Sequence, residues 1–101
     1  MSEEYSYELN GAYTEILRLY KLLTEKNIKC DLTRLYDGWR VGVKLDGSEI
    51  GDVVEHSYSY GSKLNKLEIM GFGIRDVLGH LTAEQVIEFA ETAIVERSAN
   101  K

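Results

Sequence analysis

Bulky side chains alternate with small or polar ones between residues 51 and 72 of this chain. The alternating positions are Val54, His56, Tyr58 and Tyr60. A period of two places such a set on one face of a β-strand. Gly61 and Ser62 then interrupt the run, and apolar residues return at 67–70. We expect a strand pair at the centre of a sheet, with the alternating set facing the core, or its neighbours if the register slips by one residue.

The segment before residue 27 has a different period, with apolar residues three and four positions apart. These positions are Tyr13, Ile16, Tyr20 and Leu23. That spacing places them on one face of an α-helix. We expect the helix to begin between residues 9 and 12 and to end near Lys26, because Asn27 tolerates the left-handed backbone conformation that ends helices.

Asp37-Gly38 suits a two-residue type I′ turn, and it lies between two runs rich in strand-forming residues. We predict a hairpin of residues 28–36 and 39–45, in which Tyr36 lies opposite Trp39. One face of this hairpin is then apolar, apart from Arg34. Its members are Cys30, Leu32, Tyr36, Trp39, Val41, Val43 and Leu45. We expect this face to be buried and positions 40, 42 and 44 to lie on the wetter face.

The remaining segments complete the order of elements. Residues 46–48 are expected to form a turn, residues 51–52 a break, residues 64–72 a strand and residues 74–79 a connector. Thr82 and Gln85 have the spacing of a capping box, which predicts the start of a second helix that runs to about Arg97. Its buried stripe is Val86, Phe89, Ala90, Ala93 and Ile94.

This order predicts the α+β class. We expect an antiparallel sheet of three or four strands with an N-terminal and a C-terminal helix packed on one face, in the order α-β-β-β(-β)-α. With 101 residues, the chain is expected to form a single domain over 1–101, in which residues 1–8 are a flexible polar tail.

The charge balance argues against two classes of partner. The chain has 12 basic and 17 acidic residues, a formal net charge of −5, and its basic residues are scattered singly. Binding to nucleic acid through phosphates needs a basic patch, and so does docking on anionic membranes, so we expect neither. Residues 1–9 lack the pattern of a signal peptide, and the lone Cys30 has no internal partner. These features favour a cytoplasmic protein.

His56 is the candidate general base, with Glu55 or Asp52 beside it, because imidazole titrates near neutral pH. The alternative is a partly buried, hydrogen-bonded histidine on a sheet face, which we favour because one residue does not make a site. Cys30, His56 and His80 lack the paired spacing of structural zinc ligands. We therefore assign no catalytic residue, no metal ligand and no cofactor.

Aromatic residues give the stronger indication of function. The chain has seven tyrosines and one tryptophan, more than one small core accommodates. Tyrosine and tryptophan are favoured at protein interfaces because they combine a large apolar area with a polar tip. The candidate binding residues are Trp39, His56, Tyr58 and Tyr60.

Four runs carry a resemblance to known sequences. They are DGWRV at 37–41, GDVVEHSYSYGS at 51–62, LEIMGFG at 67–73 and DVLGHLTAEQV at 76–86. Together they resemble a group of small uncharacterised proteins of phages and prophages of Gram-positive bacteria. The resemblance implies a location in the host cytosol and carries over no activity and no site residue.

The order of elements is also similar to that of the double-stranded RNA-binding domain, whose second helix begins with lysines that bind phosphate. Here the matching positions are Thr82, Ala83, Glu84 and Gln85. An RNA-binding function is therefore not implied.

We expect a non-enzymatic binding module that acts on a host or phage protein or associates with itself, as a monomer or a homodimer. In one version its acidic surface imitates phosphate charge and blocks a nucleic-acid-binding host protein. The alternatives are a small hydrolase-like enzyme using His56, and a structural or assembly component.

Overall fold

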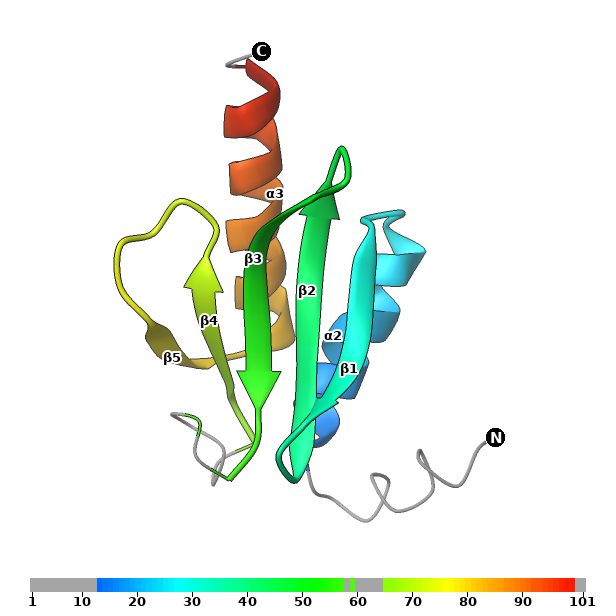
Figure 1. The fold of residues 1–101 in the computed structure, drawn as a ribbon, viewed down its shortest axis with the longest axis vertical. Helices are drawn as coiled ribbons and strands as arrows, with labels where there is room; N and C mark the ends of the chain where they lie inside the picture. Colours follow the sequence, from blue (N-terminus) through cyan, green and yellow to red (C-terminus); the bar gives the residue numbers. More distant parts are fainter. Residues whose placement is uncertain (1–12, 58, 60–64, 100–101) are drawn as a thin grey trace.

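The computed structural model describes residues 13–57, 59 and 65–99 (Figure 1). In this part of the chain, two helices and five strands follow one another as α2 (Thr14–Glu25), β1 (Cys30–Leu35), β2 (Gly38–Leu45), β3 (Ser48–Glu55), β4 (Leu67–Gly71), β5 (Leu78–Leu81) and α3 (Ala83–Ala99). The strands form one antiparallel sheet in the order β1-β2-β3-β4-β5, and both helices lie behind it in Figure 1. The predicted α+β class is confirmed. The predicted start of the first helix and the tail at 1–8 lie outside the described residues.

The core lies between the two helices and the inner face of the sheet. The helices contribute Ile16, Leu19, Leu23, Ala83, Val86, Ile87, Ala90 and Ala93. The strands and their connections contribute Trp39, Val41, Val43, Ile50, Val53, Leu67, Ile69, Phe72 and Leu81. Both helical stripes follow the expected spacing, although Ile87 and Ala83 are buried while Phe89 and Ile94 are only partly so. The helix-free face of the sheet carries charged pairs, in which Arg40 binds Glu49 and Asp52.

The turn between β1 and β2 is displaced from its predicted position. Leu35 pairs with Gly38, so the two turn residues are Tyr36 and Asp37, and Trp39 lies opposite Arg34. The register differs by two residues from the predicted one, which leaves each strand residue on its expected face. The prediction was wrong for Tyr36, which is in the turn and 70% exposed instead of in the core.

Close packing explains why Gly38 is in the strand and not in the turn. A Cβ atom on Gly38 would lie 1.9 Å from the carbonyl oxygen of Glu55 on the neighbouring strand. The glycine is therefore required where β3 approaches β2, and Tyr36 takes the turn position with a φ of 53°. The positive φ angles of a type I′ turn are found instead in the β2–β3 turn, at Asp46 (53°) and Gly47 (84°).

β3 begins and ends earlier than the sequence indicates, and the other set of alternate residues faces the core. It continues through the predicted break at residues 51–52, and it ends at Glu55 instead of reaching residue 60. Val53 and Glu55 face the core and Val54 is only partly buried, so the alternative register applies. Tyr58 and Tyr60 lie outside the described residues. β3 is the middle strand, paired with β2 and β4, so the expectation of a central strand pair is confirmed.

A fifth strand occupies part of the predicted connector. β5 pairs with β4, Leu67 with Leu81 and Ile69 with Leu78. The preceding reversal has three consecutive residues of positive φ, Gly71, Phe72 and Gly73. With only four residues, β5 has too little alternation to predict a strand, and it forms because β4 offers an edge.

Local end signals of the helices are confirmed. Asn27 has a φ of 60° and follows Lys26, the C-cap residue of α2. At α3, Thr82 accepts a hydrogen bond from the backbone nitrogen of Gln85, and the Gln85 side chain accepts one from that of Thr82, at 3.2 and 2.8 Å. Within the described residues, none of the helices is both long and apolar enough to cross a membrane.

Candidate functional site

Polar and aromatic side chains gather at the end of the sheet where α2 begins. We call this cluster the tyrosine end; its members are Tyr13, Tyr36, Asp37, Trp39 and His56. Tyr13 precedes α2, Tyr36 and Asp37 form the β1–β2 turn, Trp39 is in β2, and His56 follows β3. Three separate segments of the sequence therefore build one surface.

Tyr36 is the exposed aromatic member of this cluster. Its ring packs edge-on against the imidazole of His56, with ring centroids 5.0 Å apart and planes 73° apart. His56 is only 7% exposed, and its backbone nitrogen donates to the Ser59 hydroxyl, which in turn donates to the His56 carbonyl. A buried imidazole on a hydrogen-bonded backbone thus contacts an aromatic ring that projects into solvent.

Arg34 and Trp39 form the neighbouring pair. The Arg34 guanidinium carbon lies 4.3 Å from the centroid of the Trp39 ring, which is a cation–π geometry. Trp39 is 3% exposed, whereas Arg34 is exposed. The buried Trp39 ring therefore lies beneath an exposed cation, as the buried His56 ring lies against the exposed Tyr36.

Asp37 ties the turn to the rest of the cluster. The Tyr13 hydroxyl donates to one carboxylate oxygen of Asp37 at 2.6 Å, and the Ser57 backbone nitrogen donates to the other at 3.0 Å. The Tyr13 hydrogen bond is the main reason that the pKa of Asp37 is lowered. The same bond raises the pKa of Tyr13 to about 12. The β1–β2 turn is thereby fastened to the start of α2 and to the end of β3.

The beginning of α2 receives two more supports from the sheet side. The buried Glu55 carboxylate accepts a hydrogen bond from the Ile16 backbone nitrogen at 3.0 Å. The Asn65 side-chain oxygen accepts from the backbone nitrogens of Thr14 and Glu15 at 3.1 and 3.3 Å. A helix N-terminus favours such acceptors because its first amide groups lack partners within the helix. Glu55 thus holds α2 in place.

These contacts bear on the hydrolase alternative. Asp52 is bound to Arg40 on the helix-free face, whereas Glu55 points to the core, so the two carboxylates lie on opposite faces of β3. The hydrolase alternative pairs His56 with only one of them, Glu55 or Asp52, and it stays a prediction.

The predicted binding residues are only partly brought together. Trp39 and His56 lie at the same end of the sheet but are buried, so they present little surface themselves. Tyr58 and Tyr60 fall outside the described residues. Cys30 lies at the start of β1, and His80 is exposed in β5. Among the described residues, no three acidic, histidine or cysteine side chains are grouped to hold a metal ion.

Sequence reasoning missed three members of this site. The sequence pattern predicts Tyr36 in the core, Asp37 in the turn alone and Tyr13 in the buried helical stripe. Their joint role depends on contacts between residues 13, 37 and 57, and no local pattern carries that information. The available signal was the surplus of tyrosines over what one core can hold.

We compared the chain with known proteins at the level of family, sequence and structure. No protein-family model, no curated protein and no solved structure matches it.

Proposed function

We propose that this chain is a non-enzymatic protein-binding module, encoded by a phage or prophage of a Gram-positive bacterium, that engages a protein partner through the tyrosine end. The observation that carries the proposal is the exposed Tyr36 ring held against the buried His56. The phage origin rests on the resemblance of residues 37–86 alone.

Tyr36 has the properties of an interface anchor. Tyrosine and arginine are enriched among the residues that dominate binding energy, and Arg34 lies in β1 two residues before Tyr36 in the turn. A ring that is already fixed loses little side-chain entropy on binding. Tyr36 also holds a left-handed backbone conformation that costs a bulky residue roughly 1 kcal/mol, and such strain persists where the surroundings impose it.

The test compares three forms of the chain as bait for proteins from Gram-positive cell lysate. Beside the native chain, Tyr36→Asn removes the anchor, and Met70→Ser removes a side chain that is 55% exposed in β4. We expect one protein to be retained by the native chain and by Met70→Ser, and to be lost with Tyr36→Asn.

The purified partner then decides the point quantitatively. Loss of the aromatic anchor in Tyr36→Asn should raise the dissociation constant of the complex with the partner at least about tenfold. Retention by all three forms, or by none of them, contradicts the proposal. If light scattering finds a symmetric oligomer and no partner is retained, the chain is better described as an assembly component.

A further inference from the structure

β1 forms one border of the sheet within the described residues, where β2 is its only strand neighbour. The bond from the Lys44 backbone nitrogen to the Lys29 carbonyl, at 2.9 Å, fixes which residues face β2. In an antiparallel pair the bonded positions alternate. Asp31 and Thr33 therefore direct their backbone groups to β2, and Cys30, Leu32 and Arg34 direct theirs outward.

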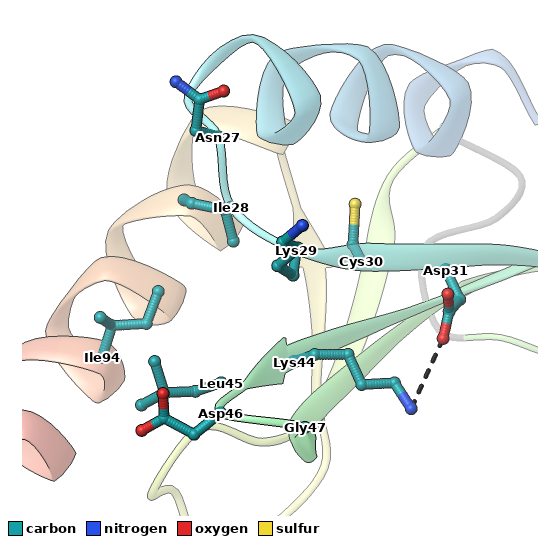
Figure 2. Close-up of a pocket in the computed structure, with 10 residues that line it drawn as sticks. All are labelled: Asn27, Ile28, Lys29, Cys30, Asp31, Lys44, Leu45, Asp46, Gly47 and Ile94. Carbon is teal, nitrogen blue, oxygen red and sulfur yellow. Dashed lines mark ion pairs between the residues drawn. The ribbon is translucent and has the colours of Figure 1, made fainter.

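A cavity lies beside the first residues of this border. It has a volume of about 770 Å³ and is lined by the connection between α2 and β1, the start of β1, the end of β2, the β2–β3 turn and Ile94 of α3. Figure 2 shows the side chains of Ile28, Leu45 and Ile94 around it, with Lys29, Lys44 and Asp31 toward β1. Because aliphatic and charged side chains both line the cavity, it suits a ligand that places an apolar side chain inside and keeps its polar main chain outside.

The charges along this border differ from those of the chain as a whole. Lys29 and Arg34 are exposed at its two ends, and the carboxylate between them, Asp31, lies 3.5 Å from the Lys44 ammonium. Counted with the cavity, this border brings together Lys29, Arg34 and Lys44 against Asp31 and Asp46, a local excess of one positive charge in a chain whose net charge is −5. A segment with acidic side chains is complementary to this border.

The cavity, the border and Tyr36 form one continuous track. The six residues of β1 span roughly 20 Å at strand spacing, from the cavity to the turn that holds Tyr36. Pairing of an added strand supplies main-chain hydrogen bonds, and pockets for alternate side chains supply selectivity.

We propose that β1 takes up an extended acidic peptide as a sixth strand, with an apolar side chain of that peptide in the cavity lined by Ile28, Leu45 and Ile94. This proposal rests on the proposed function, because the peptide is the part of the partner that lies next to Tyr36. Beyond the proposed function, it specifies that this part of the partner is extended, acidic and carries an apolar side chain.

The probe is a set of linear peptides of about ten residues, selected from a random library for binding to the native chain. We expect the selected peptides to combine acidic residues with one large apolar residue. N-methylation of each backbone nitrogen in turn should weaken binding at least about tenfold at every second position only, because alternate amides of an added strand face its neighbour. Hydrogen exchange in the complex should slow at Leu32 and Arg34.

Protein variants test the cavity without altering β1. Ile94→Ser should weaken the selected peptides at least about tenfold, whereas the matched Val95→Ser, at the next and outward-facing residue, should not. Unfolding curves of both variants establish that they are folded. Equal effects of the two variants contradict the cavity assignment.

Three further outcomes overturn the proposal. They are a failure to select any peptide, a uniform effect of N-methylation, and slow exchange at Leu32 in a dimer without peptide, which would mean that a second copy occupies β1. If these occur while Tyr36→Asn still abolishes capture of a partner, the strand addition fails and the proposed function stands. If peptides slow hydrogen exchange at Leu32 but Tyr36→Asn does not reduce capture of any partner, the proposed function fails and the peptide site stands.

Discussion

Glu15 on the first turn of α2 caps the first turn of α3, because its carboxylate accepts a hydrogen bond from the Ala83 backbone nitrogen at 2.7 Å. The same carboxylate binds Arg18 through both oxygens, and Arg18 also binds Glu84 of α3. Burial alone would raise the pKa of Glu15, but the bonds from Arg18 and Ala83 outweigh it, so the pKa is lowered. One side chain thus joins the two helices that cover the sheet.

Replacing Glu15 should destabilise the fold, because the Ala83 backbone nitrogen loses its acceptor, although Thr82 and Gln85 still cap α3. We expect Glu15→Ala to lower the free energy of unfolding by about 1–2 kcal/mol, the range for losing a side-chain acceptor at the start of a helix. Chemical denaturation measures this change. Glu25→Ala, an exposed glutamate at the end of α2, is the matched control and should cost less than about 0.5 kcal/mol. Equal losses for the two variants would mean that the contact with Ala83 adds nothing.

Asp37 should make stability depend on pH in the acid range. Its pKa is lowered in the folded chain from the ordinary value of 3.8, chiefly by the Tyr13 hydrogen bond. A depressed pKa contributes stability above the unfolded value, and this contribution is lost as the pH falls through the folded value. We expect the free energy of unfolding to decrease below about pH 4, and to decrease less steeply in Tyr13→Phe and in Asp37→Asn.

A double-mutant cycle separates this contact from other carboxylates. Because both substitutions remove the same interaction, the double variant should have a pH slope close to that of either single variant. Additive changes in slope would show that Tyr13 and Asp37 act independently. Urea unfolding at several pH values between about 2 and 6 provides the measurement.

Added side chains should cost much more stability at Gly38 than at Gly47. A Cβ at Gly38 meets the Glu55 backbone, which cannot move without disrupting β3, so Gly38→Ala should cost more than about 3 kcal/mol. Gly47 has open space around a φ of 84°, so Gly47→Asn should cost less than about 1 kcal/mol, because asparagine tolerates this conformation. Thermal unfolding of both variants checks this, and a mild effect at Gly38 would contradict the close approach of β2 and β3.

Tyr36→Asn should separate stability from binding. Asparagine adopts positive φ more readily than tyrosine, so the variant gains up to about 1 kcal/mol of backbone relief, against loss of the contact with His56. We expect a free energy of unfolding equal to or higher than that of the native chain, together with weaker partner binding. A large loss of stability would indicate that Tyr36 has a structural role, and the site would then need another anchor.

Features that depend on neighbouring residues could be predicted from the sequence. The capping box of Thr82 and Gln85, the left-handed Asn27 and the alternation of Trp39, Val41 and Val43 are set by spacing within a few positions, and each appears as predicted. These interactions are formed by groups that lie close together along the chain, so the α+β class followed from them.

The position of the first hairpin turn, and the residue exposed there, depend on contacts between distant segments. Asp37-Gly38 carries a strong local turn signal, yet contact with the Glu55 backbone holds Gly38 in β2 and places the exposed Tyr36 in the turn. Likewise, β5 forms because β4 offers it a partner. The free energy of these arrangements comes from close packing and hydrogen bonds between distant segments, which local spacing does not encode.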